Sequence, residues 1–551
     1  MRARHQFPVA VWPLAVLACL AFGALALILG QDASAGLRSR VFYNGWAFLH
    51  GYTNRDVLVA QAGGFANPTL DAAYVFLAEH LPARWLGFLL GVVQALNFPL
   101  LFAVAWRLLV VRNPFRRTLG AAVLALAGLL GACSLSEVGT AYLDAVVSLG
   151  ILSAAVVVVA NWDALSDGDP GSAAVLALVA GLPAGFAFGL RGSLVVYALG
   201  LALAFLVTNM APMRRLWLVL WFKLGALGGF AVSGLHWLTH LAGTYQNPVF
   251  PSLNHIFRSP WALPLPYGDA AAVPGSVAGL LALGLKIPLD PGLSADIWFR
   301  DYRLATVLAL LPLAALATIR RRHADPGLVT RSGPTGWLLA ATFISYTAWV
   351  FLFRTWQTLL PLEMLAPTIV VAAVGTLPLP RAARPGIGAG LVAFLVATTA
   401  TSGWTRVPWT ERAVSASIPT VEEPDHTLVL VSGREPVSFL VPLFPAPLRF
   451  VRVDAALAPV DGPETGLARQ VREAITGHDG PIRSLHPSGE EDGAEKAASA
   501  LGLTLVTTGC QTIGAAIGNG TYALCRVERA PRAAEPAVPT ATEAGAPAAG
   551  G

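Results

Sequence analysis

The sequence predicts a multi-pass α-helical membrane protein that carries a small α/β domain outside the membrane. Of its 551 residues, 55% are hydrophobic and only 13% are charged, whereas charged residues make up about 25% of an ordinary soluble domain. The apolar residues also gather in runs of about 20, the length that crosses the hydrocarbon core of a bilayer as a helix. These two observations exclude a water-soluble globular protein.

Eleven apolar runs within residues 1–403 are expected to be transmembrane helices, and the third, fifth and sixth are the shortest. They lie at about 9–30, 85–111, 118–134, 141–160, 173–190, 193–208, 216–237, 303–319, 336–353, 358–377 and 385–403. Two long connections, 31–84 and 238–302, separate some of these runs. Residues 1–403 are therefore expected to form a transmembrane domain with two large loops.

The arginines predict the orientation of this domain, because positively charged loops remain in the cytoplasm. They gather in loops on one side, at Arg2 and Arg4, Arg112, Arg116 and Arg117, Arg214 and Arg215, Arg320 to Arg322, and Arg381 and Arg384. Acidic residues at 163–169 lie on the same side, but acids contribute little to the rule. We therefore expect a cytoplasmic N-terminus, and an odd number of spans places both long connections and the C-terminal domain on the outer side.

A change of pattern after position 403 predicts the α/β domain at 404–529. Short β-type runs such as 427–431 alternate with helical patterns such as 465–476. Cys510 and Cys525 fall in this domain, on the oxidising side of the membrane and on either side of a Gly-Asn-Gly turn signal, so we expect a disulfide between them. The segment 530–551 is nearly all Ala, Pro, Gly, Glu and Thr and is expected to be disordered.

Charge and cysteine usage argue against two classes of function. The 37 Lys and Arg against 32 Asp and Glu give a net charge of +5 without a basic block, so no nucleic-acid interface is expected. The four cysteines lack the paired spacing of a zinc site. His236 and His240 are one helical turn apart, but the glutamate of a metalloprotease helix is missing. No metal site is expected from these residues.

Polar and ionisable residues gather in the expected outer segments, where a site would line a polar cavity. The candidates are the acids Asp32, Asp56, Asp71, Glu137 and Asp144, the arginines Arg38, Arg40, Arg300 and Arg354, and the amides Asn44, Asn67 and Asn247. Arginines suit an anionic headgroup or pyrophosphate because they donate bidentate hydrogen bonds. Helix capping by the acids and anchoring of the arginines at the membrane surface are the alternative interpretations.

Several strings within about 31–380 resemble membrane glycosyltransferases of the GT-C fold, in particular a bacterial group related to lipopolysaccharide-modifying transferases. The strings are Phe42-Tyr43-Asn44-Gly45-Trp46, Asn67-Pro68 with Leu70-Asp71, Ser136-Glu137-Val138-Gly139-Thr140, Asn247-Pro248-Val249-Phe250-Pro251, and Leu360-Pro361-Leu362-Glu363. The resemblance implies an enzyme of the bacterial inner membrane, with a periplasmic C-terminal domain. Such an enzyme transfers a sugar from a polyprenyl-phosphate donor to a cell-envelope acceptor on the outer face.

The resemblance also implies roles for individual residues. In this fold an acid just after the first helix acts as base or metal ligand, and an acid in the next outer loop assists it. By position, these two acids resemble Asp32 and Glu137. Related sequences carry an acid where this chain has Gly36 and an arginine where it has Gln357. Either Asp32 or Asp56 then takes over the role, or this member is inactive.

The chemistry of such a transfer needs a base for the acceptor hydroxyl and positive groups for the departing phosphate. Arg38, Arg40, Arg300 or Arg354 would supply the positive groups, and a divalent cation would be optional with a polyprenyl monophosphate leaving group. Two other classes of function remain open, namely an inactive envelope scaffold and a secondary transporter. A transporter usually has internal repeats and a polar site at the bilayer centre, and the sequence shows neither. The sugar and the acceptor are not predicted.

Overall fold

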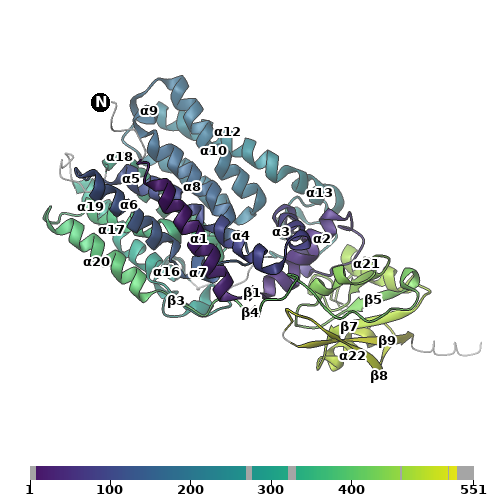
Figure 1. Ribbon diagram of the computed structural model, residues 1–551. Helices are drawn as coiled ribbons and strands as arrows, with labels where there is room; N and C mark the ends of the chain where they lie inside the picture. The colour runs from purple at the N-terminus through teal and green to yellow at the C-terminus, as the bar shows by residue number, and fades with distance from the viewer. Residues whose placement is uncertain (1–7, 268–275, 321–330, 460–461, 519, 530–551) are drawn as a thin grey trace, which may run out of the picture.

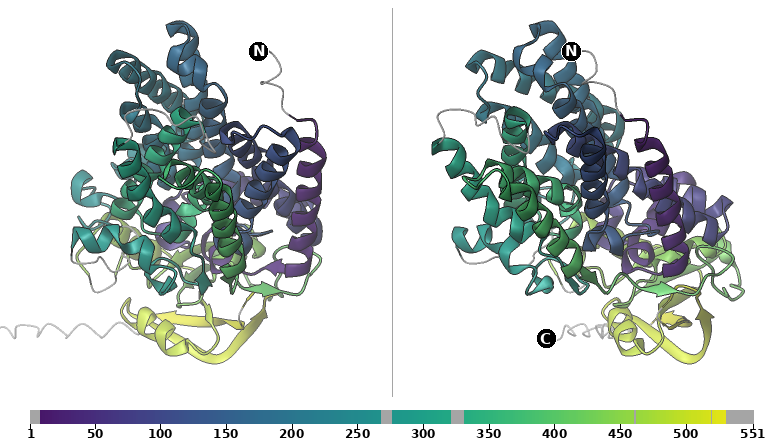
Figure 2. Two further views of the ribbon diagram at one scale, coloured as in Figure 1. Left: turned by 90° about the vertical axis from the view of Figure 1, so that its left-hand side faces the viewer. Right: turned by 60° about the vertical axis from the view of Figure 1, so that its left-hand side comes forward.

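The computed structural model describes residues 8–267, 276–320, 331–459, 462–518 and 520–529, so the tail predicted at 530–551 lies outside the described residues. A bundle of helices forms the larger part of the molecule, and a sheet domain lies against one end of it (Figure 1). Two further views show the sheet domain at the same end of the bundle (Figure 2). The described start of the first helix lies toward the opposite end.

Six helical segments of the described residues are long and apolar enough to cross a membrane. They are α1 (Val11–Leu29), α4 with α5 (Ala83–Ala95 and Asn97–Leu108), α10 (Pro170–Leu190), α12 (Pro212–Ser233), α18 (Ser332–Leu352), and η7 with α19 (Trp356–Leu359 and Leu360–Thr376). By length and composition, these segments fit six of the eleven spans that the apolar runs predicted.

The other five expected spans correspond to shorter or interrupted helices. They are α6 (Pro114–Leu129), α8 (Asp144–Ala160), η4, α11 and η5 (Gly192–Leu194, Val195–Leu203 and Ala204–Val207), α17 (Arg303–Arg320) and α20 (Ala383–Thr398). At 1.5 Å per residue, a straight helix of about 16 residues covers roughly 24 Å, less than the roughly 30 Å of hydrocarbon. Length and composition therefore support six spans and not eleven.

Glycines bring α10 and α12 into close contact. They recur at every fourth position on the facing sides, at Gly181, Gly185 and Gly189 of α10 and at Gly225 and Gly229 of α12. A Cβ atom added at any of these positions would overlap an oxygen atom of the other helix. In a bilayer, packing at such small residues replaces the hydrophobic effect as the main source of helix association.

The first outer connection folds into short elements against the end of the bundle. They are β1 (Gln31–Asp32), the π-helix η2 (Leu37–Val41), α2 (Phe42–Leu49), the 3-10 helix η3 (Gln61–Phe65) and α3 (Thr69–His80). The aromatic and aliphatic residues of α2 stand at helical spacing in the sequence, which predicts an amphipathic helix in the membrane interface, but the residues from Phe42 to Ala47 are buried. The reason is that α3 packs on one side of α2 and the C-terminal domain on the other.

The second outer connection contains α13 (Leu235–Tyr245), α14 (Asn254–Phe257), α15 (Val277–Leu281), α16 (Leu283–Lys286), η6 (Pro291–Leu293) and β2 (Phe299–Arg300). The connection between α6 and α8 contains α7 (Ala132–Ser136). At the opposite end of the bundle, α9 (Trp162–Asp167) carries Asp163, which forms an ion pair with Arg331. Arg214 of α12 donates to carbonyl oxygens of α9. The acidic stretch thus lies beside arginines of the predicted cytoplasmic side.

The C-terminal domain has a five-stranded mixed sheet of order β6-β5-β7-β9-β8. Its elements are β5 (Leu428–Val431), η9 (Ser438–Leu443), β6 (Arg449–Arg452), α21 (Gly466–Thr476), β7 (Ile482–Pro487), α22 (Glu491–Ser499), β8 (Leu503–Gly514) and β9 (Thr521–Arg529), preceded by β3 (Ala400–Thr401), β4 (Arg406–Val407) and η8 (Pro424–His426). β5 runs parallel to β6 and β7, and β9 runs antiparallel to β7 and β8. The predicted disulfide between Cys510 and Cys525 is confirmed and joins β8 to β9.

Backbone pairing attaches this domain to the outer segments. β1 pairs antiparallel with β4, and Val57 adds to the edge of the sheet, where its N–H donates to Phe450 O at 2.9 Å and its carbonyl accepts from Arg452 N at 2.9 Å. On the other side of the bundle, β2 pairs with β3. The sheet domain and the outer segments therefore share one hydrogen-bonded framework.

We expect Gly229→Ala to destabilise the purified protein by about 1–3 kcal/mol, because a methyl group at this position would force α10 and α12 apart. Gly228→Ala is the matched control, since its Cβ would meet only a leucine methyl of α10, at 3.5 Å. Thermal unfolding in detergent would compare the two. Equal midpoints would contradict the close-packing account.

A reporter enzyme that is active only in the cytoplasm should be inactive when it is fused after Trp404, because the sheet domain beyond this residue is expected on the outer side. The same reporter fused after Arg215, in a predicted cytoplasmic loop, is the control and should be active. Activity of the Trp404 fusion would refute the topology.

Candidate functional site

A cluster of ionisable side chains lies where η2, α3, α8 and α10 meet, at the end of the bundle that faces the sheet domain. We call it the outer charged cluster, and it consists of Arg40, Asp71, Glu137, Asp144 and Arg191. Four of these residues were candidates from the sequence. The structure brings them together from segments that are far apart in the chain.

Arg40 and Asp71 form the first ion pair of the cluster, with 2.6 Å between Nη1 and Oδ2. The Asp71 side chain is 3% exposed, whereas the Arg40 side chain is 22% exposed. Burial raises the pKa of Asp71 and the adjacent Arg40 guanidinium opposes this rise. Within the described part of the chain, Arg40 uses only Nη1 in this way, so further N–H groups are available to an anionic ligand.

Arg191 and Asp144 form the second ion pair, in which Nη1 lies 2.9 Å from both carboxylate oxygens. Nη2 of Arg191 donates to Tyr142 O at 2.6 Å. Arg191 was not singled out from the sequence. One signal could have found it, because an arginine between two predicted spans on the outer side runs against the usual distribution of positive charge.

Glu137 is the acid of the cluster whose carboxylate is least satisfied. It follows α7 and is 3% exposed. Its Oε1 accepts from the Cys133 thiol at 3.6 Å, whereas its Oε2 has no hydrogen-bond partner among the described residues. Burial, followed by the nearby Asp144 carboxylate, raises the pKa of Glu137 well above its ordinary value, and Arg191 opposes this effect. The surroundings of Glu137 therefore favour the protonated form of its carboxyl group.

Asp32, the first candidate base, lies in β1 and is 5% exposed. One carboxylate oxygen accepts from Ser34 N at 2.9 Å and the other from Ala141 N at 2.8 Å. Both oxygens thus accept hydrogen bonds from backbone N–H groups, and Asp32 fixes the turn that leads into Tyr142 and Asp144. These two hydrogen bonds also leave Asp32 poorly suited to hold a divalent cation. Across the described ranges, no group of three or more His, Cys, Asp or Glu side chains is arranged to bind a metal ion.

The space at Gly36, where an acid was expected from the resemblance, belongs to Tyr142. A Cβ at Gly36 would lie 3.0 Å from the Tyr142 ring. That ring in turn packs on Trp404, with 4.4 Å between the ring centroids. A larger residue at position 36 would therefore displace an aromatic contact with the segment that leads to the sheet domain.

Asp56 and Arg38 contact the C-terminal domain. The carboxylate of Asp56 accepts from Phe450 N at 2.9 Å and from the Tyr43 hydroxyl at 3.0 Å. Arg38 is 3% exposed and forms an ion pair with Glu435 at 2.9 Å. Burial raises the pKa of Asp56, which the hydrogen bond from Phe450 and the Arg55 guanidinium oppose. These two candidates hold the domains together in the structure.

The remaining candidates lie in other surroundings. The Asn67 amide donates to carbonyl oxygens of both α10 and α12, at 2.8 and 2.9 Å. Asn247 accepts from Val249 N at 3.0 Å within its own turn. Arg300 is exposed and donates to Thr398 O at 3.2 Å. Arg354 lies in the turn after α18, where its backbone N–H donates to Trp349 O at 3.2 Å. None of these contacts reaches the outer charged cluster.

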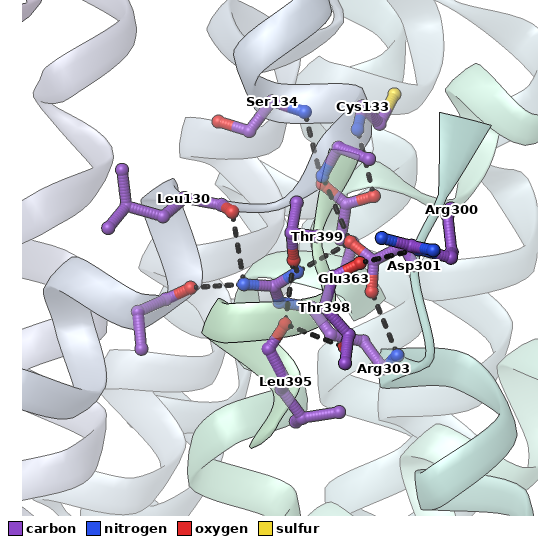
Figure 3. A network of polar contacts seen from close by, with 12 residues as sticks. Leu130, Cys133, Ser134, Arg300, Asp301, Arg303, Glu363, Leu395, Thr398 and Thr399 are labelled. Carbon is purple, nitrogen blue, oxygen red and sulfur yellow. Dashed lines mark hydrogen bonds and ion pairs between the residues drawn. The ribbon is translucent and has the colours of Figure 1, made fainter. Parts of the chain in front are cut away.

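A second polar network lies at the other end of α7 (Figure 3). Glu363 accepts from Cys133 N and Ser134 N at 3.1 and 3.0 Å, and Asp301 accepts from Ala132 N at 2.9 Å. Arg303 is 1% exposed and lies 2.5 Å from Asp301. The negative carboxylates thus face the N-terminal end of a helix, where N–H groups are unpaired. Of the residues in this network, Glu363 was noted in the sequence as the end of the string Leu360-Pro361-Leu362-Glu363.

A cavity of about 170 Å³ lies next to the outer charged cluster, between the outer segments and α21. Asn44 lines this cavity, donates to Gly63 O at 2.9 Å and lies close enough to Asp71 to lower the pKa of that carboxyl. Asp56 lies in the same wall. Asn44 therefore connects the cavity to the charged cluster.

Comparison with known proteins finds no matching family model and no matching curated relative for this chain. A functional assignment therefore depends on the arrangement of the residues themselves.

We expect Asp56→Ala to loosen the C-terminal domain, because the substitution leaves the buried Phe450 N–H and Tyr43 hydroxyl without their acceptor. The cost should be about 1–3 kcal/mol. Limited proteolysis of the segment around 404–427 would report the change as faster cleavage. Asp425→Ala, which removes an exposed carboxylate of the same domain, is the control. Equal cleavage of both variants would contradict this role of Asp56.

Proposed function

We propose that the protein is an integral membrane glycosyltransferase that moves a sugar from a polyprenyl-phosphate donor to a cell-envelope acceptor on the outer face of a bacterial inner membrane. One observation carries the proposal, namely two partly exposed arginines, each held by a buried aspartate, in a cluster that Asn44 connects to a cavity. The proposal includes a GT-C-like domain of eleven spans, in which the five shorter helices cross with the help of their neighbours. The partners are the lipid-linked donor and the surrounding membrane lipid.

Arg40 and Arg191 would bind the phosphate of the donor. Their side chains are 22% and 23% exposed, whereas Asp71 and Asp144 beneath them are 3% and 2% exposed. A buried carboxylate that orients a guanidinium reduces the entropy lost when the arginine binds an anion. Because the phosphate is charged in both the ground state and the transition state, these arginines contribute to donor binding as well as to the departure of the leaving group.

Glu137 would act as the base in this proposal. As the bond between the anomeric carbon and the donor phosphate breaks, the acceptor oxygen bonds to that carbon and its proton passes to Oε2. The unpaired state of Oε2 supports this assignment, and so does the raised pKa, because an active-site carboxylate with a raised pKa is a stronger base once it is ionised. Asp32 would be a positioning residue, since it holds the backbone of Ala141.

An inactive envelope scaffold is the second candidate. The burial of every acid in the cluster favours it, because paired and buried carboxylates also serve structure alone. Sugar transfer is the measurement that separates the two functions.

In an assay with a polyprenyl-phosphate sugar pool, Glu137→Gln should lower turnover by about two to four orders of magnitude while donor binding remains nearly unchanged. Arg40→Ala and Arg191→Ala should weaken donor binding instead. Arg412→Ala, which removes an exposed arginine of the outer side, is the control. The rate of the unmodified protein should rise with pH through the raised pKa of Glu137, because a base acts only after it has lost its proton.

Asp32→Asn and Asp56→Asn complete this comparison. A loss of turnover in Asp32→Asn alone would move the base to Asp32. Full activity in all three acid variants would eliminate the mechanism, and the absence of any transfer by the unmodified protein would favour the scaffold.

A further inference from the structure

The cavity beside the outer charged cluster has walls from three separate parts of the chain. Residues 43–47 and 53–68 form one wall, residues 237–261 form the second, and α21 of the C-terminal domain closes the third. Its volume of about 170 Å³ is below the roughly 300–1,000 Å³ of pockets that hold drug-sized ligands. The cavity therefore suits a ligand of one small ring.

Direct hydrogen bonds hold these walls in place. Gly466 N donates to Pro260 O at 2.9 Å, and Leu467 N donates to Trp261 O at 3.2 Å, so the start of α21 is attached to the second wall. The indole N–H of Trp237 donates to Phe65 O at 2.8 Å and joins the second wall to the first. The cavity is thus preformed by the docked domain.

Most of the polar side chains that line the cavity are uncharged, and six of them have no hydrogen-bond partner among the described residues. Thr53, Asn54, Gln61, His240, Thr244 and Gln470 line it, and across the described residues their side chains have no hydrogen-bond partner. Burial lowers the pKa of His240, so this ring is neutral at pH 7. Asp56 is the one acid in the described lining, and both of its oxygens are already hydrogen-bonded. No lysine or arginine of the described residues lines the cavity. A neutral ligand with several hydroxyl groups matches this set.

Aromatic rings supply the rest of the surface. Trp237, Tyr245 and Trp261 line the cavity. Tyr245 and Trp261 meet edge to face, with 5.5 Å between centroids and an interplanar angle of 82°. The faces of such rings carry partial negative charge, which attracts the weakly positive C–H groups of a sugar ring. Aromatic faces together with amide and hydroxyl groups are what a pyranose or furanose ring needs for recognition.

We propose that this cavity binds one neutral sugar ring, and that the C-terminal domain completes the site through α21. The role of the bound sugar rests on the proposed glycosyl transfer, in which it is either the sugar of the donor or the terminal sugar of the acceptor. Asn44 reaches from this cavity to Asp71 of the outer charged cluster, so a ring bound here lies next to the groups assigned to the phosphate. Sugar binding itself does not depend on catalysis.

Saturation-transfer difference NMR on the full-length protein in detergent would test the site, with methyl glycosides of neutral hexoses and pentoses as probes. We expect saturation to reach the ring protons of at least one glycoside. The double variant Thr244→Val with Gln470→Ala should reduce this signal at least severalfold, because it removes two hydrogen-bonding groups with little change in shape at position 244. Gln511→Ala, an exposed glutamine on β8, is the matched control. Equal thermal unfolding of the variants would exclude misfolding.

The outcomes separate this site from the proposed function. No signal from any neutral glycoside, or an equal signal from the double variant, would overturn the sugar site even if transfer is observed. A signal that the double variant loses would support the site even in a protein that shows no transfer. Addition of the polyprenyl-phosphate donor then distinguishes the two sources, because displacement of the glycoside identifies the donor sugar and continued binding identifies the acceptor sugar.

Discussion

The need to pair every charge that is buried beside an apolar bundle governs the outer end of this protein. An unpaired ionic group in such surroundings costs several kcal/mol, so a buried acid there either pairs with an arginine or a backbone N–H group or, as at Glu137, has a raised pKa that favours its neutral form. The protein uses both solutions. Asp71 and Asp144 are held by arginines, whereas Asp32 and Glu363 accept from backbone N–H groups of the segment around α7.

This pairing makes the segment from Ala132 to Asp144 the connector of the outer end. Its first residues donate to Asp301 and Glu363 (Figure 3). Near its end, Tyr142 O accepts a hydrogen bond from Arg191, and Asp144 forms an ion pair with the same arginine. Arg406, just before the sheet domain, donates to Val138 O of the same segment at 2.7 Å. The bundle, the outer segments and the start of the C-terminal domain therefore meet along one short stretch of chain.

The same rule separates residues with a structural role from those that can meet a ligand. Asp56 and Arg38 have partners in the C-terminal domain, so their charges contribute to docking. Arg40 and Arg191 each form an ion pair with a buried aspartate and remain partly exposed, which leaves them able to bind an anion. The described lining of the cavity between the two domains contains no arginine or lysine that could bind an anion. The cluster with Arg40 and Arg191 therefore suits an anion, whereas the cavity suits a neutral ring. A domain that docks through its edge strand can thus supply a wall of a binding site without supplying its charge.

The amino-acid sequence was enough to predict the apolar helices of a membrane protein, a C-terminal α/β domain and the pair Cys510–Cys525, because each depends on a local pattern such as hydropathy over about 20 residues or alternation over a few. It also indicated that acids and arginines gather at the outer end. Which of these residues meet became clear from the packing of the folded chain. Arg40 lies 31 positions from Asp71, Arg191 lies 47 from Asp144, and Arg38 lies 397 from Glu435. No local pattern encodes such partners, since they depend on how helices and the docked domain pack. The burial of α2 was decided in the same way, because neighbouring elements cover it.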